Sequence, residues 1–561
     1  MRFLLVIAFT LGTGAVPALS QSAEPVEATH AMVVTQKAIA SEVGVEVLKD
    51  GGNAIDAAVA TAFALAVVHP AAGNIGGGGF IVFRPSEGVP ATYDFRERAP
   101  ATASPDMWLV DGKYDSRRHH HSHLAVGVPG TVAGLHLAWQ EQGTRAWKSL
   151  IEPAIRLAEE GFSVSEELAD SLKNVLPRMK AYPASIVAFS KGGEPYQPGD
   201  VLRQPDLALT LKRIAEKGPE GFYAGETARL FALEMEKNGG LITEADLALY
   251  KAVKRSPVRG TYRGYEVLGM APPSSGGMTV VQMLNVLEAD DLSASGFGSA
   301  GTLHRYAEAM RRAFADRARH LGDPEANPRL PLRRLTSKPY ARTLRKTINP
   351  EKASVSSPDS FTWPLESDET THFSVVDANR NAVSLTYTLE WSYGSGIVVP
   401  GAGFLLNNEM GDFNAVPGRT DANGLIGTTP NLAAPGKRML SSMSPTILSR
   451  DGKVFMVTGS PGGRTIINTV LQTIVNVVDF GMNAQEAVDA GRVHHQWLPD
   501  RLVVEPERFS EEVLQGLREK GHRVVEGRRQ GVAEVIVVDP ETGRLSGGND
   551  RRVRDGAAVG Y

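Results

Sequence analysis

The feature that most constrains this fold is a change of sequence pattern about two-thirds of the way along the chain. From residue 133 to about residue 217 helical patterns predominate, and residues 302–321 predict a long amphipathic helix. Residues 350–369 are rich in serine, proline, aspartate and glutamate, which predicts an exposed linker. Beyond Thr370 the pattern is mainly that of β-strands. Because strands and helices alternate without a regular βαβ period, we expect a layered α+β fold.

The segment after the linker predicts a β-hairpin. Residues 372–376 and 382–389 have the composition of strands, and the polar residues 377–381 between them predict the turn. The other expected elements are strands at 80–83, 93–97, 454–459 and 532–539, helices at 31–50, 54–68 and 466–480, and a capping box at 243–246 that opens a helix.

The first twenty residues predict export. A basic start at Arg2, an apolar run over residues 3–16 and a small-residue exit at 17–20 are typical of a secretory signal peptide cut after Ser20. The alternative is an uncleaved membrane anchor, for which the run is short. Residues 54–68 are also apolar, but they are too few to span a bilayer and include Asp56. We therefore expect a periplasmic or secreted protein with no membrane anchor after signal removal.

Composition limits the chemistry and the partners. Removal of residues 1–20 from the 561 would leave 561 − 20 = 541 residues, enough for three or four domains at about 150 residues each. The chain has no cysteine, which excludes disulfides and thiol chemistry. Lys plus Arg number 59 against 63 Asp plus Glu, a formal net charge of −4, and this balance argues against a nucleic-acid partner.

Three conspicuous motifs carry little functional signal. The glycine run at 73–79 lacks the Gly-Lys-Ser/Thr of a phosphate-binding loop and precedes a strand, so we expect it to allow close backbone approach. The histidine run at 119–123 has no second cluster with ligand spacing, which favours a solvated loop over a zinc site. His494 and His495 fit a packed turn as well as they fit general bases.

The search for a nucleophile leads to threonine. No Gly-x-Ser-x-Gly motif is present, and Pro461 removes an N–H beside Ser460 that an oxyanion hole would use. A threonine hydroxyl becomes reactive when a base lies beside it, and an N-terminal threonine supplies its own α-amine, which titrates near about 8. Thr370 would gain such an amine if the chain were cut before it, at the end of the exposed linker.

The segment "TTHFSVVD" (370–377) resembles the start of the small subunit of gamma-glutamyltransferase, also called gamma-glutamyl transpeptidase. The segments "LLNNEMGDF" (405–413), "LSSMSPT" (440–446) and "GSPGG" (459–463) resemble later parts of that subunit. Upstream, "GGNAIDAAVA", "DFRERAP", "GVPGTVAG", "GGLITEADLALY" and "PPSSGG" also resemble the family and follow its order. The resemblance therefore covers nearly all of the chain after the first twenty residues.

The resemblance implies a self-processing N-terminal nucleophile hydrolase with a four-layer αββα sandwich. The Thr370 hydroxyl would attack the Glu369 carbonyl, and hydrolysis of the resulting ester would release Thr370 as a new N-terminus. Residues 21–369 would then form the large subunit and 370–561 the small subunit of a heterodimer that builds one catalytic unit.

The same resemblance implies roles for individual residues. The catalytic residues would be the nucleophile Thr370, its hydrogen-bond partner Thr388, and the oxyanion-hole glycines Gly462 and Gly463. The residues that bind a γ-glutamyl group would be Arg96, Ser441 and Ser442 for its α-carboxylate, and Glu390, Glu409 and Asp412 for its α-ammonium. A bidentate guanidinium suits a carboxylate better than lysine does. Arg98 is the local competitor of Arg96. At position 423, where some bacterial members carry a lid tyrosine, this chain has asparagine.

The function that follows is transfer of the γ-glutamyl group of glutathione and related donors through a Thr370 acyl-enzyme, either to water or to amino acid and peptide acceptors. No cofactor and no metal are implied. The first alternative is a glutaryl-type β-lactam (cephalosporin) acylase on the same scaffold, against which the retained Glu409 and Asp412 argue. The second is a non-catalytic periplasmic ligand-binding protein, against which the intact catalytic residues argue.

Overall fold

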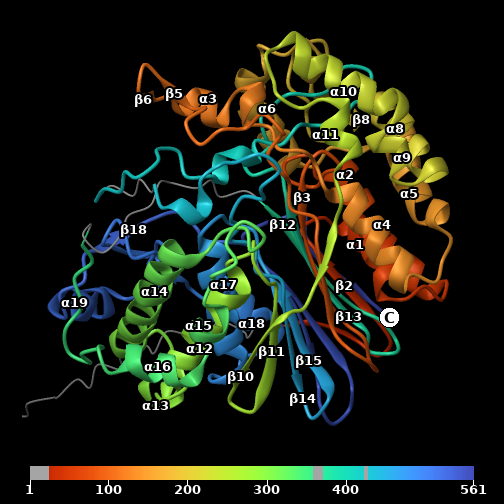
Figure 1. The fold of residues 1–561 in the computed structure, drawn as a ribbon. Coiled ribbons are helices and arrows are strands. Elements are labelled where there is room, and N and C mark those ends of the chain that lie inside the picture. The colour runs from red at the N-terminus through yellow and green to blue at the C-terminus, as the bar shows by residue number, and fades with distance from the viewer. Residues whose placement is uncertain (1–23, 358–369, 423–426) are drawn as a thin grey trace, which may run out of the picture.

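The computed structural model describes residues 24–357, 370–422 and 427–561. The predicted signal peptide, the cleavage residue Glu369 and the lid residue Asn423 lie outside these described residues. Two seven-stranded antiparallel sheets lie face to face, and helices cover the outer side of each (Figure 1). This is the four-layer αββα sandwich that the sequence resemblance implies.

The strands of each sheet come from distant parts of the chain. The first sheet contains, in spatial order, β1 (Val26–Ala28), β20 (Leu545–Asn549), β19 (Glu534–Val538), β15 (Lys453–Gly459), β14 (Thr446–Arg450), β11 (Tyr265–Gly269) and β10 (Val258–Tyr262). The second contains β21 (Ala557–Gly560), β2 (Met32–Thr35), β12 (Thr371–Val376), β13 (Ala382–Thr388), β3 (Gly78–Arg84), β4 (Ala91–Asp94) and β9 (Val253–Arg255). Both sheets therefore combine strands from before and after the predicted cut.

Each sheet has its own helical cover (Figure 1). The helices α1 (Ala38–Lys49), α2 (Ala54–Val68) and α4 (Thr131–Gln142) pack on the second sheet, with α5 (Trp147–Glu160), α6 (Glu166–Met179), α8 (Pro205–Lys217) and α10 (Gly225–Lys237) on the same side of the molecule. The helices α12 (Gly276–Leu287), α17 (Thr465–Val478) and α18 (Ala484–Asp489) pack on the first sheet, with α14 (Ala300–His320), α16 (Lys338–Arg345) and α19 (Glu511–Glu519) outside them.

Shorter elements connect these layers. They include β5 (Leu109–Val110), β6 (Lys113–Tyr114), α3 (Ser116–His120), η1 (His123–Ala125), β7 (Phe162–Ser163), α7 (Pro183–Phe189), β8 (Val201–Leu202), α9 (Glu220–Tyr223), α11 (Glu244–Ala248), α13 (Leu292–Ser295), α15 (Leu332–Leu335), η3 (Glu409–Asp412), η4 (Thr429–Asn431), β16 (Val493–His494), β17 (Leu502–Val504) and β18 (Val524–Glu526). Within the described residues, no helix combines the length and the apolar character that a membrane crossing needs.

The two strands that carry the hairpin occupy the centre of the second sheet. Thr371 pairs with Tyr387 and Val376 with Ala382, and the turn between them is closed by Asp377, whose Oδ1 accepts from the backbone N–H of Asn381 at 2.9 Å. All side chains of both strands are buried. The predicted hairpin is confirmed, and it is held rigidly because layers cover both of its faces.

The two faces of β12 meet different surroundings. Phe373 and Val375 belong to the apolar core under α2, whereas Ser374 points between the sheets and donates to the Glu534 carbonyl of β19 at 3.2 Å. Ser384 of β13 likewise donates to a carbonyl of β15 at 2.9 Å. Hydrogen bonds as well as apolar contacts therefore join the two sheets beside the start of β12.

Two sequence predictions about the N-terminal part have different outcomes. Residues 31–50 were expected to be one helix, but residues 32–35 form β2, and the helix begins only at Ala38. This prediction is wrong because a short apolar run is ambiguous by periodicity, and pairing with both β12 and β21 decides its conformation. The glycine run does allow close approach: a Cβ on Gly77 would lie 2.0 Å from the Thr388 carbonyl oxygen.

Candidate active site

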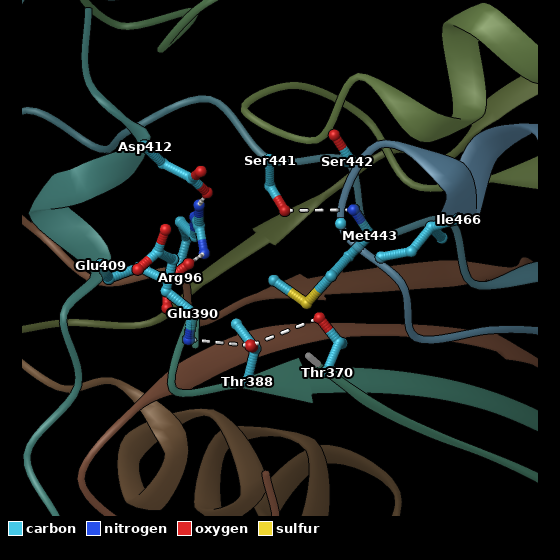
Figure 2. A pocket seen from close by; sticks show the side chains of 11 residues that line it. Arg96, Thr370, Thr388, Glu390, Glu409, Asp412, Ser441, Ser442, Met443 and Ile466 are labelled. Atoms are coloured by element: carbon cyan, nitrogen blue, oxygen red, sulfur yellow. Dashed lines mark hydrogen bonds and ion pairs between the residues drawn. The ribbon is translucent and has the colours of Figure 1, made fainter. Parts of the chain in front are cut away.

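A pocket lies at the ends of the two central strands of the second sheet. Thr370 directly precedes β12 and Thr388 ends β13, so antiparallel pairing brings both side chains to the same edge. The residues that line the pocket are Arg96, Thr370, Thr388, Glu390, Glu409, Asp412, Ser441, Ser442, Met443, Gly463 and Ile466 (Figure 2). Every predicted catalytic or substrate-binding residue except Gly462 lines this one pocket.

Thr370 is a buried residue whose hydroxyl faces a second hydroxyl. Its Oγ1 donates to Oγ1 of Thr388 over 3.4 Å (Figure 2). The Thr388 hydroxyl also accepts from the backbone N–H of Glu390 at 2.9 Å, and the Thr388 carbonyl accepts from Asn74 Nδ2 at 2.9 Å. Because Thr388 is fixed through both groups, it can hold the Thr370 hydroxyl in one orientation.

Arg96 forms the charged wall of the pocket. The chain leaves the sheet at the end of β4, and the guanidinium, which is 0% exposed, makes ion pairs with Glu409 and Asp412 of η3 (Figure 2). Its Nη2 also donates to the Leu440 carbonyl at 3.0 Å and its Nε to the Met439 carbonyl at 3.3 Å. The guanidinium is therefore fixed in position by contacts with two separate segments.

This wall holds more acids than bases. Glu97 Oε2 lies 3.5 Å from Arg96 Nη1, so three carboxyl groups surround one guanidinium. Burial raises the pKa of Glu97 to about 8, although Arg96 opposes the shift, and burial likewise raises the pKa of Glu409 well above its usual range. Burial acts against the charge of Arg96, but Glu409, Asp412 and Glu97 together raise its pKa. Oε1 of Glu97 and Oε2 of Glu409 are buried without a hydrogen-bond partner.

The two serines enter the pocket from the segment before β14. The Ser441 hydroxyl accepts from the backbone N–H of Met443 at 3.2 Å (Figure 2). The Ser442 hydroxyl accepts from Nη2 of Arg317 at 2.8 Å, and Nε of Arg317 donates to the Ser275 hydroxyl at 2.7 Å. Sequence reasoning missed Arg317, because nothing in the helical pattern of α14 marks one of its several arginines as buried behind a serine.

The glycine pair lies in the turn between β15 and α17. Gly462 has φ +126° and Gly463 φ +53°, in the region that favours glycine. Ser460, just before them, uses its hydroxyl within the loop: it donates to the Pro461 carbonyl at 2.6 Å and accepts from the backbone N–H of Val532 at 2.9 Å. This geometry agrees with the expectation that Ser460 is a poor nucleophile candidate.

Comparison with known proteins identifies the family. The family model described as Gamma-glutamyltranspeptidase matches residues 40–561. The chain belongs to the gamma-glutamyltranspeptidase family. It is 50% identical over 545 residues to the "Glutathione hydrolase proenzyme" of Escherichia coli strain K12, which covers 96% of this chain and 93% of that protein.

Solved structures support both the family and the fold. Cephalosporin acylase from Bacillus halodurans superposes with a TM-score of 0.85 at 29% identity, covering 99% of each chain. Gamma-glutamyltranspeptidase from Helicobacter pylori superposes with a TM-score of 0.56 at 48% identity, covering 56% of this chain and 91% of its own. As a gamma-glutamyltranspeptidase family member, the chain is an enzyme of the N-terminal nucleophile hydrolase type, as the sequence resemblance implied.

The histidine run requires a correction. It was expected to be a solvated loop, but His119 and His123 are only 1% and 6% exposed. His119 Nε2 donates to the Met410 carbonyl at 3.2 Å, its Nδ1 accepts from the Tyr114 hydroxyl at 3.0 Å, and His123 Nε2 contacts Glu234 at 2.9 Å. The run forms α3 and η1, which pack beside η3 in this family member. The prediction failed because a polar run can be buried when its partners lie far away in sequence.

Other histidines are packed as well. His494 contacts Asn468 at 2.6 Å and His495 contacts Asp500 at 3.2 Å, so they form the packed turn that was one of the two expectations. In the part of the chain that the structure describes, one group of ligand-type side chains could hold a metal: His304, Glu308 and His522. There His304 Nδ1 and His522 Nε2 already share a hydrogen bond of 2.8 Å. Glu308 is paired with two arginines, Arg311 and Arg312, which compete with any cation.

Proposed function

We propose that this chain is a self-processing gamma-glutamyltransferase that forms a γ-glutamyl-enzyme ester on Thr370 and acts on glutathione and related donors. The observation that carries the proposal is the position of the Thr370 hydroxyl, 3.4 Å from that of Thr388, in the same pocket as Arg96, Glu409 and Asp412. A nucleophile with its orienting partner thus faces a site that carries both signs of charge.

Maturation is the first step of the proposal. The Thr370 Oγ attacks the carbonyl carbon of Glu369, the peptide C–N bond breaks as the hydroxyl proton passes to the nitrogen, and an ester results. The Thr370 amine is free from this step on. Water then cleaves the ester, which leaves the Glu369 carboxyl group, restores the Thr370 hydroxyl and separates the two chains. Residues 21–369 become the large subunit and 370–561 the small subunit. The two remain associated because strands of both subunits are hydrogen-bonded to one another in each sheet.

Turnover then uses the new N-terminus. The Thr370 amine takes the hydroxyl proton while Oγ attacks the γ-carbonyl carbon, and the proton passes to the leaving amine. Backbone N–H groups of Gly462 and Gly463 stabilise the oxyanion, an effect typically worth about 3–4 kcal/mol per donor. Water or an acceptor amine of an amino acid or peptide finally cleaves the ester. The chain's own residues suffice for these steps.

Binding of the donor follows from its charges. A γ-glutamyl group brings an α-carboxylate and an α-ammonium, and the pocket offers Arg96 with the two serines for the former and acids for the latter. The ammonium would meet Glu409, whose Oε2 has no hydrogen-bond partner. Asp412 and Glu390 also line the pocket, beside Arg96 (Figure 2). Such a zwitterion replaces one set of ion pairs by another without changing the net charge of the site.

Processing is the direct test. Scaled by length from 60.1 kDa, the two subunits should migrate at roughly 37 and 20 kDa. N-terminal sequencing of the smaller band should read Thr-Thr-His-Phe, and Thr370→Ala should stay uncut and inactive because alanine has no hydroxyl. A single uncut band with full activity would contradict the proposal. N-terminal sequencing of the larger subunit tests removal of residues 1–20 and, with cell fractionation, the proposed periplasmic or secreted location.

The acylase alternative has a specific basis in the likeness to the Bacillus halodurans protein, whose title names cephalosporin acylase. A glutaryl group lacks the α-ammonium, so it would leave the buried acid of Glu409 without a cation other than Arg96. We therefore favour γ-glutamyl donors. Turnover of γ-glutamyl and glutaryl anilides by the same preparation decides between the two.

A further inference from the structure

Helix α3 places His120 against a carboxylate of the pocket. His120 Nδ1 lies 3.7 Å from Oε1 of Glu390, and the two side chains are only 12% and 4% exposed. No hydrogen-bond partner reaches His120 Nδ1, which is buried. Glu390 itself has φ +80°, a backbone conformation that is costly for a residue with a side chain. A strained acid and a buried imidazole nitrogen thus face each other at the rim of the donor site.

Further contacts fix both groups. The His120 ring stacks on Trp391 at 5.2 Å and 16°. Nδ2 of Asn408 donates both to the His120 carbonyl at 3.3 Å and to Oε2 of Glu390. The backbone N–H of Trp391 donates to Oδ1 of the same Asn408 at 3.1 Å. One amide therefore ties the helix that carries His120 to the acid that lines the pocket.

A glycine makes room for this contact. Gly411 lies in η3 next to Asp412, and a Cβ added to it would sit 2.4 Å from His120 Nδ1 and 3.3 Å from Oε1 of Glu390. Gly411 does not have a left-handed φ, so its backbone would accept another residue. What its missing side chain provides is space for the imidazole.

We propose that His120 determines donor specificity: when a donor binds, its Nδ1–H, 3.7 Å from Oε1 of Glu390 in this structure, donates to that oxygen and holds the carboxylate toward the α-ammonium of the donor. The inference deepens the proposed function and depends on it. His120 acts here as a positioning residue, because it touches Glu390 and not the reacting atoms. The role was absent from the sequence reasoning, which had placed His120 in a solvated loop.

The charge state of the imidazole fits this role. Burial lowers the pKa of His120 to about 4, against an opposing effect of Asp412. The ring is therefore neutral near pH 7 and carries a single N–H, which Glu390 draws to Nδ1. A neutral donor aligns the carboxylate without cancelling its charge, so the acid keeps its attraction for an ammonium group.

The experiment compares two small competitors that differ only in the ammonium. Inhibition constants of L-glutamate and of glutarate are measured on cut enzyme with a γ-glutamyl anilide as substrate. His120→Leu should raise the inhibition constant of glutamate about ten-fold, the loss expected for one hydrogen bond to a charged group. It should raise that of glutarate less than about two-fold. His120→Asn should restore most of the difference, because its amide can take the place of Nδ1–H. His121→Leu, at the residue that directly follows α3, is the matched control and should change neither constant.

A second variant tests the geometry without altering His120. Gly411→Ala should displace the imidazole and weaken glutamate binding as much as His120→Leu does. The double variant should bind glutamate no more weakly than either single variant. Equal losses for glutamate and glutarate, or additive losses in the double variant, overturn the inference. If wild-type enzyme does not turn over the γ-glutamyl anilide at all, the proposed function fails. If it does, and His120→Leu leaves the glutamate-to-glutarate ratio unchanged, only the role of His120 fails.

Discussion

Two buried ion clusters in this molecule contain the same residue types but differ in the ratio of acidic to basic side chains. The pocket cluster surrounds Arg96 with Glu97, Glu409 and Asp412. The second cluster, which we call the C-terminal cluster, consists of Arg492, Arg552, Glu505 and Asp550. The first has three acids for one base, whereas the second has two of each.

Hydrogen bonding separates the two clusters further. In the C-terminal cluster Arg492 donates to the Val488 and Gln530 carbonyls at 2.6 and 2.7 Å, and Asp550 accepts from the Ala533 N–H at 2.9 Å. No side-chain atom of its four members is buried without a partner, whereas the pocket cluster leaves oxygens of Glu97 and Glu409 unpaired. A balanced, saturated cluster serves the fold, while the pocket cluster keeps buried carboxyl oxygens to which an ammonium group can donate.

The sharpest test removes one acid from the balanced cluster. Asp550→Ala leaves two buried guanidinium groups with one carboxylate, and breaking a buried pair in this way typically costs about 3–5 kcal/mol. We expect that loss in the free energy of unfolding, measured with urea in the uncut Thr370→Ala background. The same change in otherwise native enzyme should leave kcat/KM per mole of cut protein close to wild type. A stability loss under about 1 kcal/mol would contradict a structural role.

The matching change in the pocket should act on catalysis. Asp412→Ala should lower kcat/KM for a γ-glutamyl donor, because the donor's buried ammonium loses a charged partner. The expected loss of transition-state stabilisation is about 2–5 kcal/mol. It should change the free energy of unfolding in urea much less than Asp550→Ala does, because Arg96 keeps its ion pair with Glu409. Turnover of a glutaryl donor is the internal control. Equal losses on both donors would show that Asp412 supports the fold and not the ammonium.

Much of the fold and most of the pocket residues could be predicted from the sequence. The fully buried helix at 54–68 and the hairpin at 371–388 follow from local pattern, and both are found. The pocket residues could be found through motifs, and the chain brings them together although Arg96 and Asp412 are 316 positions apart.

The sequence could not give the contacts that depend on three-dimensional context. The strand at 32–35 was not predicted, because pairing with neighbouring strands decides its conformation. The burial of His119 depends on Met410, 291 positions away. Nor could composition distinguish Arg492 from other arginines, because its partners come from three separate segments. Charge balance within a cluster is a property of the fold and becomes visible only there.

A smaller effect should appear in the pH dependence of stability. Burial raises the pKa of Glu97 from its ordinary value near 4.5 to about 8, so between these values the folded chain binds a proton that the unfolded chain has lost. Stability should therefore fall as pH rises through this window, by at most about 1.4 kcal/mol per pH unit. Glu97→Gln should reduce the slope, and the remainder is expected from Glu409, whose pKa burial also raises.

The C-terminal cluster provides the contrast for this measurement. Burial acts to raise the pKa of Asp550, but Arg492 and Arg552 outweigh it and lower that pKa, so Asp550 is ionised in both states above about pH 5. Asp550→Asn should thus lower stability without changing the slope between about pH 5 and 8. A slope that is unchanged in Glu97→Gln would mean that Glu97 does not hold the proton.

The smallest expected effect concerns the uncharged pair beside the ion cluster. The Thr388 hydroxyl accepts from Thr370 at 3.4 Å and from the Glu390 N–H at 2.9 Å, but neither contact involves a charge. Thr388→Val keeps the shape and removes the hydroxyl, so we expect the activation free energies of processing and of turnover to rise by about 0.5–1.5 kcal/mol. Thr388→Ser keeps the hydroxyl and should retain most of the rate. The measurements are the time course of subunit formation and kcat with a γ-glutamyl anilide. If serine is as impaired as valine, the methyl group and its packing are what matter, and the orientation of Thr370 must come from elsewhere in the pocket.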